Sequence, residues 1–248
     1  MNKLHIAEHF LSVQGEGLSV GMPAVFIRLQ HCILECKWCD TVEVWKQGRA
    51  YLREEFHELL RGYYKEQRLY TVPRLVITGG EPLMQQKVLA EWLDEFVENT
   101  DEEYGLGAVP VVEVETAGVL MPSAELRSLV KQWNVSPKLD NSGESFVRRF
   151  NPKTLAAFGQ IDRSNEASVC WKFVIGRESD LDEVHSILDA AYLLDDDMGK
   201  VAVYLMPEAK TRAEFLALAP NVAEWCKATG YRFGNRLQLI CWDKATGV

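Results

Sequence analysis

Short apolar runs alternate along the chain with segments of helical periodicity. The runs that predict strands are Ala24–Leu29, Arg74–Thr78, Val109–Glu115, Val169–Ile175, Lys200–Met206 and Arg236–Trp242, with a shorter one at Trp133–Val135. The segments that predict helices are Leu52–Gln67, Pro82–Asn99, Ser179–Leu194, Arg212–Leu218 and Asn221–Thr229. We expect Pro220 to separate the last two helices, because proline cannot donate a helical hydrogen bond. Strand–helix alternation predicts an α/β fold with a mostly parallel sheet, either open or curled into a partial (β/α) barrel.

Nothing along the chain indicates a division into domains. The 248 residues are 47% hydrophobic and 25% charged, which suits one compact core. The sequence shows no repeat, no low-complexity tract and no obvious linker. We therefore expect a single domain over residues 1–248.

Polar and glycine-rich loops directly follow the predicted strands. They are His31–Thr41, Thr78–Pro82, Glu115–Gly118, Ser136–Lys138 and Met206–Glu208. In parallel α/β folds, function gathers at the carboxyl ends of the strands and in the loops that follow them. We therefore expect these five loops to meet on one face of the sheet.

The first of these loops carries three closely spaced cysteines, Cys32, Cys36 and Cys39. Three thiolates on one short loop can bind three irons of a cubane cluster and leave the fourth iron open for chemistry. A zinc site would need a fourth ligand, and His31 adjoins Cys32, which makes a shared tetrahedron hard to build. A disulfide would pair two of the thiols and leave the third one unpaired. The spacing favours an iron–sulfur site after the first core strand, with zinc as the main alternative.

Composition excludes several other classes of protein. The formal net charge of -9 argues against a nucleic-acid partner, because binding phosphates requires a basic surface. No run approaches the ~18 apolar residues of a membrane span, and residues 1–9 show no signal peptide. The remaining cysteines, Cys170, Cys226 and Cys241, are scattered in apolar surroundings and are expected to be buried. This cysteine usage favours a reducing cytoplasm.

Taken singly, the other candidate residues have two interpretations each. Arg28 interrupts an apolar run, so it forms either a structural ion pair, for example with Glu16, or a clamp for a carboxylate. Gly79-Gly80 either lets the backbone approach a ligand, with Glu81 accepting from an amine, or makes a turn into a helix. Thr41 offers oxygen to magnesium or caps a helix.

The motifs taken together resemble a known family. Cys32-x-x-x-Cys36-x-x-Cys39 followed by Gly79-Gly-Glu-Pro82 resembles the radical S-adenosylmethionine superfamily. Gln14-Gly-Glu-Gly17, Arg28, Asp40-Thr41, Glu115-Thr116 and Ser136–Gly143, in that order, narrow the resemblance to the 7-carboxy-7-deazaguanine synthase family. The match runs to the carboxyl end, where Asn235–Trp242 is similar to the closing strand of that family.

This resemblance implies a cofactor set and a reaction. A [4Fe-4S] cluster binds S-adenosylmethionine through its open iron and cleaves it reductively, giving a 5′-deoxyadenosyl radical. Such an enzyme is a carbon–nitrogen lyase that contracts 6-carboxy-5,6,7,8-tetrahydropterin to 7-carboxy-7-deazaguanine with loss of ammonia, in queuosine or other deazapurine biosynthesis. Magnesium assists. The resemblance also implies a flavodoxin-like electron donor and a homodimer.

The resemblance assigns roles to individual residues. Cys32, Cys36 and Cys39 match the cluster ligands, and Thr41 matches the magnesium ligand. The cofactor contacts are Gly80, Ser136, Pro137 and Lys138, joined by Glu81, Glu115, Met206, Pro207, Glu208 and Ala209. The substrate contacts are Val13, Gln14, Gly15, Glu16, Arg28 and Thr78. An anionic pterin carboxylate suits Arg28, and a guanidine-like pterin edge suits Glu16 as acceptor.

The sequence departs from the family pattern at two places, and two alternative functions remain open. Ala117 stands where members of the family often carry asparagine, and the tail Trp242–Val248 differs from the usual ending, which leaves the role of Val248 open. One alternative is an activating enzyme that places a glycyl radical on a partner protein. The other is a non-enzymatic zinc or electron-transfer protein.

Overall fold

In the part of the chain that the structure describes, nine strands form one sheet in the order β3-β1-β2-β4-β5-β6-β7-β8-β9. The computed structural model describes residues 2–65, 72–100, 102, 104–191, 201–245 and 247. The strands are β1 (Leu4–Val13), β2 (Pro23–Leu29), β3 (Arg49–Tyr51), β4 (Arg74–Gly79), β5 (Val112–Thr116), β6 (Gln132–Val135), β7 (Ser168–Ile175), β8 (Ala202–Pro207) and β9 (Arg232–Phe233). β1 is antiparallel to β2 and β3, and the other neighbouring strands are parallel.

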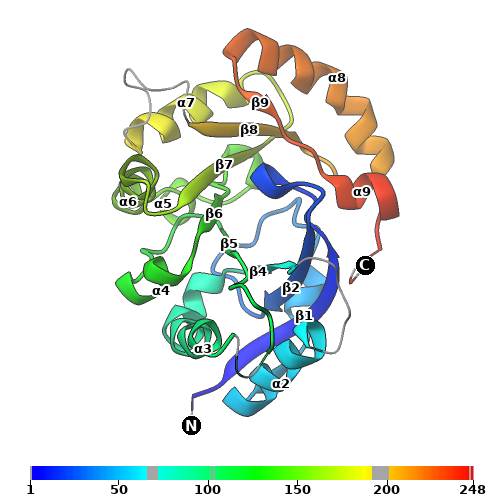
Figure 1. Ribbon diagram of the computed structural model, residues 1–248. Coiled ribbons are helices and arrows are strands. Elements are labelled where there is room, and N and C mark those ends of the chain that lie inside the picture. The colour runs from blue at the N-terminus through cyan, green and yellow to red at the C-terminus, as the bar shows by residue number, and fades with distance from the viewer. Residues whose placement is uncertain are drawn as a thin grey trace.

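Most of the helices lie on the outer side of the curved sheet (Figure 1). The helices of the described ranges are α1 (Val42–Trp45), α2 (Arg53–Tyr64), α3 (Gln86–Glu98), α4 (Ala124–Leu129), α5 (Phe146–Arg149), α6 (Pro152–Ser164), α7 (Asp180–Ala190), α8 (Arg212–Thr229) and α9 (Leu237–Trp242), with 3-10 turns η1 (Gly17–Ser19), η2 (Pro82–Gln85) and η3 (Asp140–Ser142). Of these, α1 and α9 contribute residues to the opposite, inner side. The prediction of an α/β fold with mostly parallel strands is confirmed. The sheet is open, with β3 and β9 at its edges, and it curves as a partial barrel.

The prediction of a strand at Arg236–Trp242 is wrong, because Leu237–Trp242 forms helix α9. The free edge of β8 is already taken by β9, which pairs with it in parallel. The chain then turns back at Arg236, and the Leu237 amide donates to the Gly15 carbonyl at 3.0 Å. The same apolar run therefore packs as a helix against the start of the chain.

Pro220 does not separate two helices, since α8 runs through it from Arg212 to Thr229. Pro220 is exposed, so its ring and the missing hydrogen bond fall on the solvent side, while Phe215 and Val222 are buried. Thr211 and Glu214 form a capping box at the start of the helix, and Gly230 ends it in the left-handed conformation. These two caps fix one long helix despite the proline.

Strand alternation divides the sheet into an apolar face and a polar face. On β2, Ile27 belongs to the main hydrophobic core, whereas Arg28 lines a cavity. On β7, Trp171 belongs to the same core, whereas Lys172 lines the cavity. Because successive side chains of a strand point to opposite faces, one face packs against the helices and the other is left for chemistry.

The main core lies between the sheet and its helices. Aromatic rings dominate it near α3, where Phe96 is fully buried and contacts Tyr104 edge-on at 4.7 Å between centroids. Phe96 also packs against Tyr64 of α2, at 5.6 Å. In the described ranges, no helix is long and apolar enough to cross a membrane.

We expect Phe96→Ala to lower the free energy of unfolding by about 3–5 kcal/mol, because it opens a cavity between α2 and α3. Urea denaturation followed by circular dichroism measures this loss. Val147→Ala is the control, since Val147 is 87% exposed and its truncation is expected to change stability by less than about 0.5 kcal/mol. Equal effects of the two substitutions would contradict this placement of the core.

Candidate active site

The five polar loops meet at a cavity of about 790 Å³ on the polar face of the sheet. The convergence predicted from the sequence is confirmed. The predicted site residues that line the cavity are Val13, Gln14, Gly15, Glu16, Arg28, Cys32, Cys36, Cys39, Thr41, Thr78, Gly80, Glu115, Ser136, Lys138 and Met206. Among the described residues, Glu81, Pro137, Pro207, Glu208 and Ala209 were also predicted to contact the cofactor but do not line it.

The three cysteines of the first loop are free thiols at one side of this cavity. The Cys39 amide donates to the Cys36 carbonyl at 3.0 Å, so the loop turns tightly between them. Burial raises the pKa of Cys32 to about 11 and also raises the pKa of Cys36. A bound metal cation would lower these pKa values again, because it stabilises the thiolates and the displaced protons leave to solvent.

The donor set fits an iron–sulfur cluster in its chemistry. Three free cysteines share one loop and one cavity. Within the described ranges, no three His, Cys, Asp or Glu side chains are gathered closely enough to hold a metal ion as they stand. The loop is held from outside, where the Lys37 amide donates to the Ser142 carbonyl at 2.9 Å and Trp38 donates to Asn141 at 3.3 Å.

Gly79 and Gly80 bring strand β4 against the cysteine loop. A Cβ on Gly80 would lie 2.1 Å from the His31 carbonyl oxygen, and Gly79 has a φ of +145°. The Glu81 amide donates to that same carbonyl at 2.8 Å. One interpretation of the two glycines was a close approach of the backbone to a ligand. In the structure, Gly80 makes its close approach to the backbone of His31, just before Cys32.

From the sequence, the Glu81 carboxylate is expected to accept a hydrogen bond from an amine of the ligand. In the structure, however, Glu81 does not line the cavity. It is fully buried and accepts from the Thr116 hydroxyl and the Ala117 amide, both at 2.8 Å. It also accepts from the Leu83 amide at 3.1 Å and so caps η2. Glu81 therefore ties the loops after β4 and β5 together behind the cavity wall.

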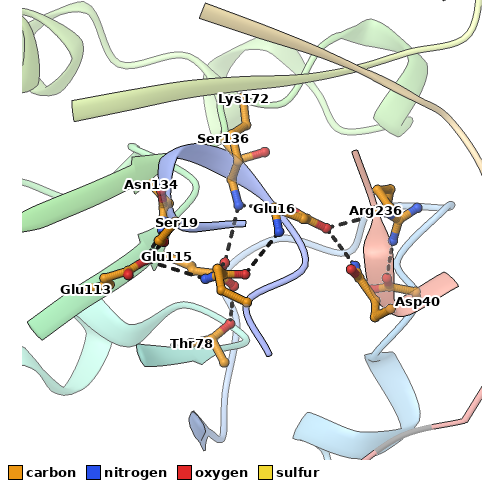
Figure 2. A network of polar contacts seen from close by, with 12 residues as sticks. Glu16, Ser19, Asp40, Thr78, Glu113, Glu115, Asn134, Ser136, Lys172 and Arg236 are labelled. Atoms are coloured by element: carbon orange, nitrogen blue, oxygen red, sulfur yellow. Dashed lines mark hydrogen bonds and ion pairs between the residues drawn. The ribbon is translucent and has the colours of Figure 1, made fainter. Parts of the chain in front are cut away.

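Lys172 connects two of the predicted contact residues on the polar face (Figure 2). Its Nζ donates to Glu16 Oε2 at 2.9 Å and to Glu115 Oε1 at 3.3 Å. The Thr78 hydroxyl donates to the other oxygen of Glu115 at 2.8 Å. Strands β4, β5 and β7 thereby share one polar cluster with the loop that follows β1.

The segment before and within α9 completes the wall on the Glu16 side. Gln238 donates to Glu16 Oε1 at 2.8 Å, and Arg236 Nε lies 3.4 Å from the same oxygen. Arg236 also pairs with Asp40, between Cys39 and Thr41. Burial alone would raise the pKa of Glu16, but the Lys172 and Arg236 cations outweigh it and lower the pKa to about 2.

A second buried carboxylate, Glu113, holds the turn between β1 and β2 to the sheet. It accepts from the Ser19 hydroxyl at 2.9 Å, from Gln132 at 3.0 Å and from Asn134 at 3.1 Å. Arg74 pairs with it as well. Gln14-Gly-Glu-Gly17 does lead into a turn between antiparallel strands, but buried polar contacts fix its position.

Arg28 pairs with Glu8 on the neighbouring strand β1, not with Glu16 as the sequence suggested. The two residues are register partners, and Arg28 Nε donates to Glu8 at 2.8 Å. Glu16 is instead held by Lys172 and Arg236. The bond to Glu8 uses one of the five N–H donors of the guanidinium, and Arg28 lines the cavity.

Lys138 and Thr41 line the cavity, and their side chains make few hydrogen bonds to other parts of the protein. Lys138 Nζ donates to the carbonyl and hydroxyl of Ser136, at 2.9 and 3.1 Å. Thr41 precedes α1, but its side chain makes no capping hydrogen bond. Its hydroxyl lies 3.8 Å from the Cys39 sulfur. Thr41 thus occupies the N-cap position of α1 and its carbonyl accepts from the Trp45 amide at 3.0 Å, but its hydroxyl is not used in the cap.

Sequence reasoning missed Glu113, Asn134, Lys172, Arg236 and Gln238. Glu113, Asn134 and Lys172 could have been found, because each is a polar residue at an alternate position of an apolar strand. Arg236 and Gln238 alternate with leucines in the same way, but the strand expected there is helix α9, so the pattern could not have placed them beside Glu16. Cys170 and Cys226 are buried as expected, whereas Cys241 is exposed.

Comparison with known proteins agrees with this site. Residues 13–135 match a family model described as a 4Fe-4S single cluster domain. A 7-carboxy-7-deazaguanine synthase of Pyrobaculum aerophilum is 32% identical over 245 residues, which is 99% of this chain and 97% of that protein. The enzyme of the same name from Escherichia coli is 30% identical over 80% of this chain and 82% of its own length.

Two solved structures also resemble this chain. The crystal structure of QueE from Escherichia coli has a TM-score of 0.67 and 25% identity, and covers 94% of this chain and 93% of that one. A structure of anSMEcpe with bound AdoMet, with a TM-score of 0.55 and 10% identity over 82% of this chain and 60% of that one, supports the fold alone. The full-length likeness to the archaeal relative, together with the cysteine loop and the cavity beside it, shows that the chain belongs to the 7-carboxy-7-deazaguanine synthase family.

Proposed function

We propose that this protein converts 6-carboxy-5,6,7,8-tetrahydropterin to 7-carboxy-7-deazaguanine with loss of ammonia, as a radical S-adenosylmethionine lyase. One observation carries the proposal. A chain that matches synthases of that name over its full length places its three loop cysteines in the same cavity as the Gln14–Glu16 loop and Arg28. Cluster ligands and groups suited to an anionic pterin thus share one enclosed space.

On the cofactor side, Cys32, Cys36 and Cys39 would hold the [4Fe-4S] cluster. When bound, the cluster supplies the electron that cleaves S-adenosylmethionine and so starts the radical chemistry. The backbone at Gly80 lies directly beside the cluster loop, and Ser136 and Lys138 line the wall. We assign S-adenosylmethionine to this wall, with Glu115 and Met206 as further contacts.

On the substrate side, Arg28 suits the pterin carboxylate, because a guanidinium binds a carboxylate through paired, charge-assisted hydrogen bonds. Glu16 and Gln14 suit the amine and amide groups of the pterin ring, and Thr78 lies beside them. Thr41 would bind Mg²⁺, whose preferred ligands are oxygens. These residues bind and orient the substrate.

Apolar side chains in the cavity wall would help a bound substrate to displace water from the reacting groups. Phe10, Phe26, Trp38 and Leu239 line the cavity together with the polar residues. Water exclusion protects a radical from unwanted quenching and strengthens each polar contact within the site.

Several features of the wider biology rest on the family resemblance. We propose that the chain forms a single domain, works as a homodimer in the cytoplasm and receives its electron from a flavodoxin-like protein. We also propose that its product enters queuosine or other deazapurine biosynthesis.

The reaction can be tested directly. After anaerobic reconstitution with iron and sulfide, the reduced protein is incubated with the pterin, S-adenosylmethionine and Mg²⁺, and the products are separated by chromatography. We expect 7-carboxy-7-deazaguanine together with methionine and 5′-deoxyadenosine. Turnover of S-adenosylmethionine without the deazaguanine would refute the substrate assignment, and zinc without sulfide in anoxically purified protein would refute the cluster.

We expect Cys36→Ala to abolish cluster assembly and all cleavage of S-adenosylmethionine, because two thiolates cannot replace three ligands to the cubane. Iron and sulfide analysis and the visible spectrum measure the cluster. Cys241→Ala is the matched control, since the Cys241 side chain is exposed and does not line the cavity, and it should retain wild-type iron content. Full iron content in Cys36→Ala would contradict the ligand assignment.

We expect Arg28→Ala to raise the KM for the pterin by roughly 10- to 100-fold while cluster content stays unchanged, because a charge-assisted hydrogen bond contributes about 1.5–3 kcal/mol. Initial rates over a range of pterin concentrations measure KM, and iron analysis measures the cluster. Arg53→Ala, an exposed arginine of α2 that pairs with Glu54, serves as the control. A parallel loss of iron would mean that Arg28 is structural.

A further inference from the structure

Lys172 is a buried cation in the middle of an apolar strand. Its side chain is 4% exposed, and its neighbours Trp171 and Phe173 belong to the main core. A lysine buried in this way destabilises the fold unless anions compensate its charge. Two carboxylates do so here, and they come from different parts of the chain.

The two carboxylates belong to opposite sides of the proposed site. Glu16, at 2.9 Å from Lys172 Nζ, is assigned to the substrate, and Glu115, at 3.3 Å, is assigned to S-adenosylmethionine. Figure 2 shows the lysine side chain reaching down from its strand between them. Lys172 therefore occupies the junction between the two binding surfaces.

Each oxygen of Glu16 has its own partners. Gln238 and Arg236 approach Oε1 from the carboxyl-terminal segment, at 2.8 and 3.4 Å. Lys172 donates to Oε2 from β7. The two sets of partners thus act on the same carboxylate torsion from opposite sides, and removing either set leaves the carboxylate held at one oxygen only.

We infer that Lys172 is a positioning residue of the substrate site, whose ammonium holds the Glu16 carboxylate in orientation and ties it to Glu115. This inference rests on the proposed function, because it takes Glu16 to be the group that accepts hydrogen bonds from the pterin. Lys172 acts through Glu16 and does not itself need to touch the substrate.

The charges around Glu16 predict how substrate binding should depend on pH when Lys172 is replaced. Lys172 and Arg236 face it as cations, Gln238 is neutral, and Cys170 lies next to Lys172 along β7. Burial raises the pKa of Glu16, and the two cations lower it to about 2, so the carboxylate is ionised throughout the neutral range. Removing the Lys172 charge raises the pKa of Glu16, and a protonated Glu16 accepts hydrogen bonds less well.

The test is equilibrium binding of the pterin to the cluster-loaded, unreduced enzyme, by anaerobic isothermal titration calorimetry at several pH values. We expect Lys172→Met to weaken binding by about tenfold or more near neutral pH. We also expect its affinity, relative to wild type, to fall further as the pH drops from about 8 to about 6. Lys172→Arg, which keeps the charge, should restore most of the affinity and the wild-type pH profile.

A double-mutant cycle separates positioning from a general structural role. If Lys172 acts through Glu16, the double variant Lys172→Met, Glu16→Gln should bind the pterin as weakly as Glu16→Gln alone. Additive losses would overturn the inference. If Lys172→Met alone fails to fold, the double variant can still be compared with Glu16→Gln. In the double variant the Glu16 carboxylate is absent, so it is not left buried without its lysine partner. Lys153→Met, an exposed lysine of α6, should match wild type throughout.

The two proposals fail in different ways. If the wild-type protein does not bind the pterin, the proposed function falls. If wild type binds it and Lys172→Met binds equally well at every pH, the inference about Lys172 falls and the function stands.

Discussion

The alternation of side chains along a strand is the constraint on which the rest of this structure depends. Each central strand sends one set of residues into the helix-covered core and the other set to the opposite face. Apolar residues occupy the first set and form the main core. The second set is then free to carry Arg28, Thr78, Glu115, Asn134 and Lys172, one from each of the strands β2, β4, β5, β6 and β7, all lining one cavity.

Buried charge makes this polar face rigid. A carboxylate such as Glu113 or Glu16 is costly to remove from water unless several donors surround it. The donors come from the sheet, from the turn after β1 and from the segment before α9, so compensating the charge also joins these parts together. The network that stabilises the site is thus the same one that shapes it, and Glu16, Glu113 and Lys172 each have at least two partners in it.

Much of the fold was readable from the sequence because its strands are buried and their apolar runs are continuous. Strand β1 was missed because most of its residues are only half-buried, so polar residues such as His5 and Glu8 hide its alternation. The end of the chain was misjudged because an apolar run of six residues suits a short helix as well as a strand, and only the occupied edge of β8 decides between them. The predicted helix ends at Gln67 and Leu194 fall outside the described residues, as does Val248, whose role the sequence left open.

For the site, motifs located the loops, but they could not give the partners. The sequence gives no sign that Glu81 turns inward, that Arg28 meets Glu8, or that Glu16 meets Arg236. Such pairings depend on which strands become neighbours and on their register. Lys172 was detectable by the argument that singled out Arg28, a charge inside an apolar strand, yet no motif drew notice to it.

The contact between the two ends of the chain has a consequence for biosynthesis. Glu16 and Gln238 are separated by 222 positions, and Asp40 and Arg236 by 196. As the ribosome releases the protein from its amino terminus, the cysteine loop emerges early, but the residues that close the cavity emerge last. Iron delivered to the nascent chain would therefore meet an unfinished site, whereas a cluster inserted after release would meet a closed one. The wall around Glu16 is thus complete only after both of these segments have been synthesised.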